Sequence, residues 1–233
     1  MNILFKIILL CLYTNLVTAQ VKPNRFTDLN DYGFSGKIKA ISSRYYSDFY
    51  QQQNKWEVRD TLRFDYSIAY EINKNGDFTK KTVVDTADPH QLIYRFYGEV
   101  KEGWEKIGKD GKVEEAGTII WQGNKSFEET TYDPYGVKLF VSKFILGANF
   151  RTQTQIDIGY NNDGSKTLHM ISTYQEDKEG HMHFINTVEK LKKTNTKLES
   201  LVLEKDSQNN PVKILLKKNG KPYLLRLITI SYE

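Results

Sequence analysis

Apolar and polar residues alternate along most of this chain with a period of two. The clearest stretch is residues 64–72, where every second residue is apolar: Phe64, Tyr66, Ile68, Tyr70 and Ile72. Successive side chains of a β-strand point to opposite faces, so this period predicts a strand with one buried face. The pair Asn75-Gly76 follows directly. We therefore expect residues 78–84 to return antiparallel as the second arm of a hairpin.

The same pattern predicts further strands, with residues 36–41 opening the domain: 92–97, 104–107, 113–121, 127–132, 138–146, 152–160, 166–174, 181–188, 198–204, 212–217 and 223–232. No helical crossover separates them, so the predicted fold is all-β. We expect an antiparallel meander of about 10–13 strands that forms a curled sheet or an open barrel. Residues 36–233 are predicted to be a single domain, and residues 20–35, which lack a clear period, an irregular N-terminal arm.

Tight turns join these strands at Asp or Asn followed by Gly. Asp and Asn side chains bond their own backbone, Pro presets φ, and Gly accepts positive φ, which are the properties that β-turns need. The predicted structural turn residues are Asn75, Gly76, Asp110, Gly111, Asp133, Pro134, Gly136, Asp163, Gly164, Asn219 and Gly220.

Residues 186–201 fit two interpretations. Val188, Leu191, Leu198 and Leu201 have the spacing of a helical stripe. Polar residues 194–196 in the middle favour a turn between two strands instead, and we predict the two strands.

One turn resembles a known repeat. Tyr132-Asp133-Pro134-Tyr135-Gly136 is similar to the tyrosine–aspartate core of YD (RHS-like) repeats. Residues 33–39, and the ending at 219–221 and 226–228, are similar to small secreted bacterial proteins that are built from such hairpins. The resemblance implies a repeating β surface outside the cytoplasm. It implies no catalytic residue.

The first nineteen residues resemble an export signal. Lys6 precedes an apolar run at residues 7–12, and Val17-Thr18-Ala19 has the small residues of a cleavage site, so we predict a signal peptide at 1–19. The alternatives are a membrane anchor, for which the apolar run is too short, and a lipoprotein signal at Cys11. We predict export to the periplasm, the cell surface or the medium, and no membrane-spanning segment after cleavage.

Cys11 is the only cysteine. Its removal leaves no disulfide, cysteine-ligated zinc or cysteine nucleophile.

Charge is unevenly distributed along the chain. The net charge is +4, but residues 190–226 carry ten Lys or Arg against three acids, which makes that segment +7 and the remainder −3. Such a segment can bind an anionic partner. Alternatively, lysines coat the edges and solvent faces of the late strands, where they discourage aggregation. We favour the second interpretation and do not predict nucleic-acid binding.

Two histidines have the spacing of metal ligands. His181 and His183 are two residues apart on a predicted strand, so their side chains share a face and could hold zinc or copper. A third ligand would come from His169 or Glu176. The alternative is a pair of solvated histidines beside a turn.

Recognised catalytic motifs do not occur. Residues 33–36 do not fit a nucleophile elbow, and no phosphate loop, zinc-protease motif or complete calcium loop is present. No cofactor is predicted. A pair of carboxylates distant in sequence could still meet in space, so a secreted hydrolase stays open as an alternative.

Aromatic residues are frequent, at 13%, and are densest at residues 45–50. Tyr45, Tyr46, Phe49 and Tyr50 could stack on a sugar or contact a protein partner. Alternatively they pack across strands, as most aromatic residues of sheets do.

These observations together predict an exported, non-catalytic β protein that acts as a binding or structural surface. Its partner would be a cell-envelope protein, a polysaccharide or an apolar ligand. One alternative is an open-barrel carrier of a lipid, with a cavity walled by the face of residues 64–72. The other is the hydrolase.

Overall fold

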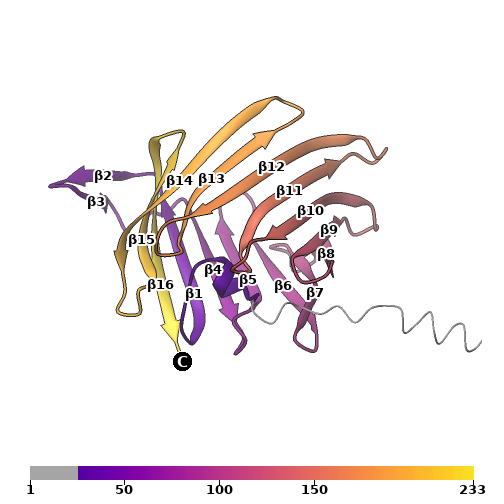
Figure 1. The fold of residues 1–233 in the computed structure, drawn as a ribbon, viewed down its shortest axis with the longest axis horizontal. Helices are drawn as coiled ribbons and strands as arrows, with labels where there is room; N and C mark the ends of the chain where they lie inside the picture. Colours follow the sequence, from indigo (N-terminus) through magenta and orange to yellow (C-terminus); the bar gives the residue numbers. More distant parts are fainter. Residues whose placement is uncertain (1–25) are drawn as a thin grey trace, which may run out of the picture.

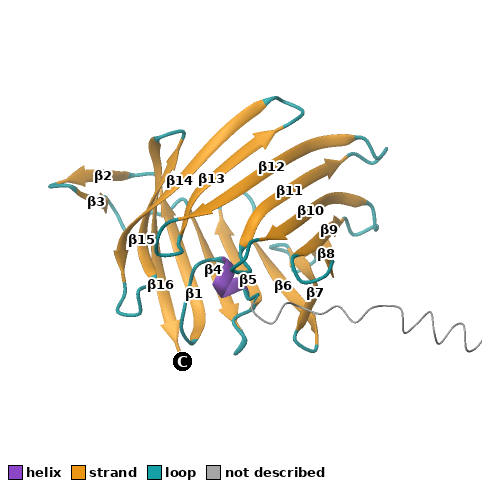
Figure 2. Ribbon diagram, viewed as in Figure 1, coloured by secondary structure: helices purple, strands orange, loops and turns teal. Residues whose placement is uncertain are grey.

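Residues 26–233 fold into a closed antiparallel β-barrel of fourteen strands with one hairpin outside it (Figure 1). The computed structural model describes residues 26–233; the predicted signal peptide lies outside them. Figure 2 shows that nearly all of the chain is strand or loop. The barrel strands are β1 (Ile38–Tyr46), β4 (Tyr66–Ile72), β5 (Phe78–Asp85), β6 (His90–Tyr97), β7 (Val100–Ile107), β8 (Val113–Trp121), β9 (Ser126–Tyr132), β10 (Lys138–Leu146), β11 (Thr152–Tyr160), β12 (Lys166–Glu176), β13 (Met182–Glu189), β14 (Thr194–Lys205), β15 (Pro211–Lys218) and β16 (Lys221–Tyr232).

The predicted antiparallel meander is confirmed. From β4 to β16 every strand pairs with the next strand along the chain, and β1 pairs with both β16 and β4, which closes the barrel. The strand count exceeds our expectation because residues 36–41 extend into a full strand. In addition, β2 (Phe49–Gln52) and β3 (Lys55–Val58) form a separate hairpin. Residues 26–233 contain no helix that is long and apolar enough to cross a membrane.

Residues 186–201 form two strands, as predicted, but the turn lies elsewhere. It spans residues 190–193, and Lys193 has a φ of 55°. Thr194 and Thr196 are paired positions at the start of β14, opposite Glu189 and Thr187. The polar residues thus belong to the strand, because threonine suits a strand better than a turn.

The Asp/Asn–Gly sequences form the turns of the barrel. Gly76, Gly111, Gly136, Gly164 and Gly220 all have φ between 79° and 84°, in the region that favours glycine. Asp133 shows how a side chain shapes such a turn. Its carboxylate accepts the backbone N–H groups of Tyr135 and Val137 at 2.9 and 2.7 Å, next to Pro134. In the same way, the carboxylates of Asp163 and Asp110 each accept the backbone N–H of the residue two positions later. Asn75 donates its backbone N–H to the Asn73 side chain in the turn before β5. Asn219, which precedes Gly220, has a φ of 50°.

The apolar face predicted for residues 64–72 points into the barrel. Tyr66, Ile68 and Tyr70 pair with Tyr45, Ser43 and Ile41 of β1, and the shared side of the two strands is the inner one. Ile68 and Ile72 pack against a buried cluster that also contains Tyr70 and Phe78. Phe64 precedes β4, and its ring lies 5.5 Å from the Arg44 guanidinium.

The described part of the predicted N-terminal arm, residues 26–35, packs inside the barrel. It contains a one-turn helix, α2 (Asp28–Asp31), which begins after Thr27 because the Thr27 hydroxyl accepts the N–H of Asn30. Leu29 and Phe34 join the inner cluster, each with 6% of its surface exposed. Figure 1 shows α2 among the strands near the end of the barrel where β1 begins and β16 ends. We call residues 26–35 the plug and this end the plugged end.

The outer hairpin covers part of the barrel's outside. Tyr46 and Leu225 pair across β1 and β16 on the outer side, yet both are fully buried. The β3 strand of the hairpin lies against β16. Lys213, on the outer face of β15, bonds Glu57 of β3 at 3.2 Å and Glu204 at 3.0 Å. The hairpin is therefore attached to the barrel wall by both apolar burial and charge.

Candidate functional site

The plug lies between two cavities inside the barrel. The larger measures about 290 Å³ and the smaller about 160 Å³. Asp31, Tyr32 and Phe144 border both. Closed barrels of this size are wide enough to hold a ligand cavity, whereas small ones are filled by their own side chains.

Tyr32 is one of the side chains that lie between the two cavities. Its ring meets Phe78 edge-on at 5.2 Å and Tyr70 at 5.8 Å. Protein surrounds it, yet 43% of its surface remains accessible because it borders empty space on two sides. The neighbouring Tyr70 phenol and burial hold the pKa of Tyr32 well above its usual range. The phenol is therefore a neutral hydrogen-bonding group at physiological pH.

The plug is bonded to the β4–β7 side of the barrel through Asp28 and Leu29. The Asp28 carboxylate accepts the Phe78 N–H at 2.7 Å and forms an ion pair with Lys101. The Leu29 N–H donates to the Gly76 carbonyl at 3.0 Å. The contacts with Gly76 and Phe78 fix the helix against the turn between β4 and β5, and the ion pair joins it to β7.

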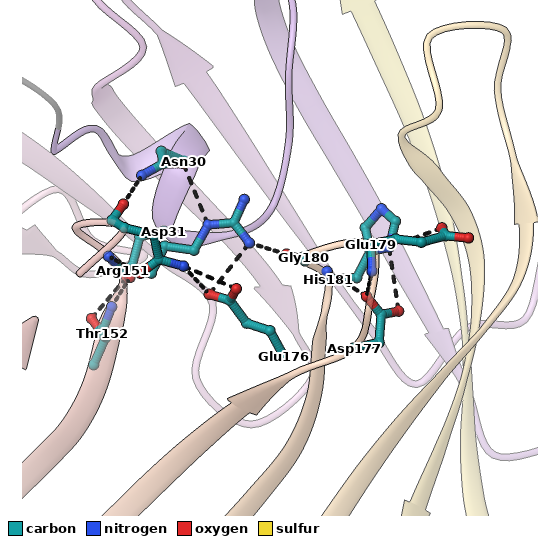
Figure 3. Close-up of polar contacts among 10 residues, drawn as sticks. Asn30, Asp31, Arg151, Thr152, Glu176, Asp177, Glu179, Gly180 and His181 are labelled. Atoms are coloured by element: carbon teal, nitrogen blue, oxygen red, sulfur yellow. Dashed lines mark hydrogen bonds and ion pairs between the residues drawn. The ribbon is translucent and has the colours of Figure 1, made fainter. Parts of the chain in front are cut away.

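A second polar network joins the plug to the opposite wall (Figure 3). Asp31 accepts hydrogen bonds from the backbone N–H and the hydroxyl of Thr152, which begins β11. Arg151 donates to the Asn30 side chain at 3.3 Å and to the Gly180 carbonyl, and lies 3.4 Å from Glu176. Arg151 therefore connects the plug to the turn between β12 and β13. Burial raises the pKa of Asp31 in spite of the Thr152 hydrogen bonds.

The larger cavity has a mixed wall, in which the polar residues Thr152, Gln155, His181 and Ser200 lie among apolar ones. Its apolar lining includes Phe34, Met182, Val202 and Ile214. At one side Tyr174 donates a hydrogen bond to Gln155 at 2.6 Å.

Among residues 26–233, Arg226 of β16 is the only Arg or Lys that lines this cavity. Its Nε and Nη2 both donate to the Ser43 hydroxyl, at 3.1 and 2.9 Å. Its guanidinium also lies 5.5 Å from the centre of the Tyr45 ring.

The smaller cavity combines aromatic rings with charged groups. The Lys101 ammonium lies 4.2 Å from the Tyr94 ring centre and pairs with Asp28. Glu129 lines the same cavity, where burial raises its pKa in spite of a hydrogen bond from Trp104. The carboxylates of Asp28, Asp31 and Glu129 thus line one cavity, and those of Asp28 and Asp31 are bonded to the wall.

The four aromatic residues singled out in the sequence do not share one surface. Tyr45 points into the barrel and stacks on Tyr66, with ring centres 4.3 Å apart. Tyr46, the next residue, is buried on the outer side and donates to the Thr61 carbonyl at 3.0 Å. Phe49 packs on Trp56 in the outer hairpin, and Tyr50 lies 5.5 Å from Arg59. Their role in ligand binding stays a prediction.

His181 and His183 contact different partners. The Nδ1 atom of His181 is buried 3.4 Å from Asp177 and 3.7 Å from Glu179 (Figure 3). These are electrostatic contacts, without hydrogen-bond geometry. The Nδ1 atom of His183 is 3.0 Å from the Ser200 carbonyl. Within residues 26–233 no three His, Cys, Asp or Glu side chains are grouped as metal ligands. A metal at the His181–His183 pair stays a prediction.

Known proteins are similar to this chain in structure but not in sequence. No family model matches it, and no curated protein matches it. A porin-like protein from Bacteroides vulgatus ATCC 8482 aligns with a TM-score of 0.50 and 9% identity, over 84% of this chain and 98% of that one. The chain shares the fold of this porin-like barrel. A second porin-like protein, from Bacteroides uniformis ATCC 8492, has a TM-score of 0.44 and 8% identity over the same shares.

Arg226, Tyr32 and Glu129 are not among the site residues predicted from the sequence. A signal for Arg226 was present, because it is the one charged residue among the alternating positions Leu224, Arg226, Ile228, Ile230 and Tyr232. A charge on an otherwise apolar face needs a partner. Tyr32 and Glu129 carried no comparable signal, since their surroundings come from distant segments.

Proposed function

We propose that this chain is an exported, non-catalytic barrel that binds a small ligand inside its lumen. The observation that carries the proposal is the pair of cavities on either side of Tyr32, inside a closed barrel. Protein interiors are normally close-packed, with few voids larger than a water molecule. Mainly apolar walls with a few placed polar groups are typical of small-molecule sites.

The residues on the inner and outer faces of the barrel wall favour a barrel that is surrounded by water. The inner side holds two clusters of buried aromatic and aliphatic residues. The outer side carries cross-strand ion pairs at 3.4 to 3.7 Å: Glu71–Lys80, Arg95–Glu105 and Glu199–Lys217. A membrane barrel has the opposite arrangement, with an apolar band facing lipid and a polar interior. With the predicted signal peptide, this supports a water-exposed barrel in the cell envelope or outside the cell.

Binding of the neutral fluorescent probe N-phenyl-1-naphthylamine would test the proposal. We expect the full chain to bind one probe molecule, as measured by native mass spectrometry and by enhanced fluorescence. Val202→Phe places extra volume in the larger cavity, and we expect it to weaken probe binding by roughly tenfold, or about 1.4 kcal/mol.

The matched control is Leu201→Phe. Leu201 is the preceding residue of β14 and points outward, with 38% of its surface exposed. We expect it to bind the probe as the original chain does. Absence of probe binding, or equal binding by the two variants, would refute a luminal ligand site.

A further inference from the structure

We propose that the larger cavity selects an amphipathic anion, whose carboxylate or sulfonate binds Arg226 while its apolar body lies against the inner wall. This inference names the ligand class and rests on the proposed luminal site. It begins from the charge of Arg226. Among residues 26–233, no carboxylate lies within ion-pair distance of its guanidinium, and its only hydrogen-bond acceptor is the Ser43 hydroxyl.

The orientation of the guanidinium leaves its anion-binding edge available. Arginine has five N–H donors in a planar fork. Ser43 is approached by Nε and by one Nη2 hydrogen, so the bonds to it occupy one edge of the fork. The other edge, formed by Nη1 and the second Nη2 hydrogen, matches the two oxygens of a carboxylate or sulfonate.

Ser43 and Tyr45 hold the guanidinium in place. Ser43 is completely buried, and its hydroxyl receives both bonds from Arg226. Tyr45 presents its ring 5.5 Å from the guanidinium and is itself stacked on Tyr66. A cation that is oriented in advance loses little conformational entropy when it binds an anion.

The apolar part of the cavity wall fits the apolar body of the ligand, and Thr152, Gln155, His181 and Ser200 make the remainder of the wall polar. Ile214 pairs directly with Arg226 across β15 and β16, and Phe34, Val202 and Met182 continue the apolar lining. The acid on this wall, Asp31, is bonded to Thr152, and burial raises its pKa. Its repulsion of an anion is therefore weaker than that of a free carboxylate. A volume of about 290 Å³ suits a small ligand, near the lower end of the usual range for binding pockets.

Two probes with the same aromatic skeleton distinguish the contribution of the anionic group to binding from that of the apolar body. N-phenyl-1-naphthylamine is neutral, and 8-anilinonaphthalene-1-sulfonate carries a sulfonate on the same rings. We expect the full chain to bind the sulfonate more tightly. We expect Arg226→Gln to weaken sulfonate binding by roughly tenfold or more and to change binding of the neutral probe by less than about twofold.

Arg95→Gln is the matched control, because Arg95 lies on the outer wall beside Glu105. It should leave both affinities unchanged. Displacement of the neutral probe by decanoate and by decan-1-ol from the unmodified chain tests the same point without mutation, in case Arg226→Gln does not fold. Decanoate should displace the probe at a concentration roughly tenfold lower.

The outcomes distinguish the two proposals. If the neutral probe binds but the sulfonate and decanoate have no advantage, the luminal site stands and the anion preference is wrong. The anion preference is also wrong if Arg226→Gln and Arg95→Gln affect sulfonate binding equally. If no probe binds at all, the luminal site itself is refuted.

Discussion

Replacing Leu29 by alanine tests whether the plug is an integral part of the barrel. Leu29 has 6% of its surface exposed, and packs in a cluster with Phe34, Ile41, Tyr70 and Phe78. Its side chain comes from α2, so all of these contacts are between the plug and the barrel or within the plug. The substitution deletes buried carbon groups without changing any polar contact of the plug.

The expected loss of stability follows from the buried area. Removing the carbons beyond Cβ costs roughly 2.4 kcal/mol, at about 0.8 kcal/mol for each buried methylene. The residual cavity adds to this cost, so we expect Leu29→Ala to lower the free energy of unfolding by about 3 kcal/mol, inside the ~2–5 kcal/mol range of such substitutions. This loss is expected only if the plug and the barrel unfold together. If the plug can detach from a folded barrel, the loss of unfolding free energy cannot exceed the free energy with which the plug docks.

Chemical denaturation followed by tryptophan fluorescence measures the free energy of unfolding. Hydrogen exchange of residues 29–34 shows whether the plug itself stays docked. Leu62→Ala is the control, because Leu62 is 82% exposed and should cost nearly nothing. The Leu29 and Phe34 amides donate to the Gly76 and Leu29 carbonyls, so they should exchange slowly in the original chain. A loss below about 1 kcal/mol together with fast exchange at Leu29 would refute the docked plug.

Three further predictions test the interior and the outer hairpin. Burial raises the pKa of Glu129 above its ordinary value of 4.5, so this carboxyl group binds its proton more firmly in the native state than in the unfolded state. The free energy of unfolding therefore falls as the pH rises from 4.5 through the native pKa. Glu129→Gln should therefore stabilise the protein at pH 8 but not at pH 4, as judged by thermal unfolding, and equal effects at both values would contradict the burial argument. Gly117→Ala would place a Cβ 2.3 Å from the Trp104 ring, so it should cost about 1–3 kcal/mol, and much of that loss should disappear when Trp104→Leu is added. Lys213→Met removes the cation that Glu57 of the hairpin contacts, so limited proteolysis within residues 49–58 should accelerate; an unchanged cleavage rate would show that apolar burial alone attaches the hairpin.

Local rules explain why so much of the fold could be predicted. A period of two needs only neighbouring residues to define a strand, and an Asp–Gly pair needs only its own backbone to form a turn. The strands around Asp133-Pro134 and Asp163-Gly164 therefore lie where the pattern predicts them. The same rule also separates Tyr45 from Tyr46, because consecutive residues of a strand point to opposite sides. Tyr45 and Tyr46 therefore lie on opposite sides of β1.

Closure and the site depended on contacts between distant segments. The pairing of β1 with β4 joins residues on either side of the outer hairpin, and the pairing of β1 with β16 joins the two ends of the described chain. No local pattern specifies either. The plug, Arg226 and the cavities exist only after closure, because a cavity consists of the space that side chains from many strands leave unfilled. The sequence alone therefore determined the strands, their turns and the face that is buried. Only the tertiary structure decided that this face encloses a lumen, that residues 26–35 enter it, and that Arg226 lies there without a carboxylate partner among the described residues.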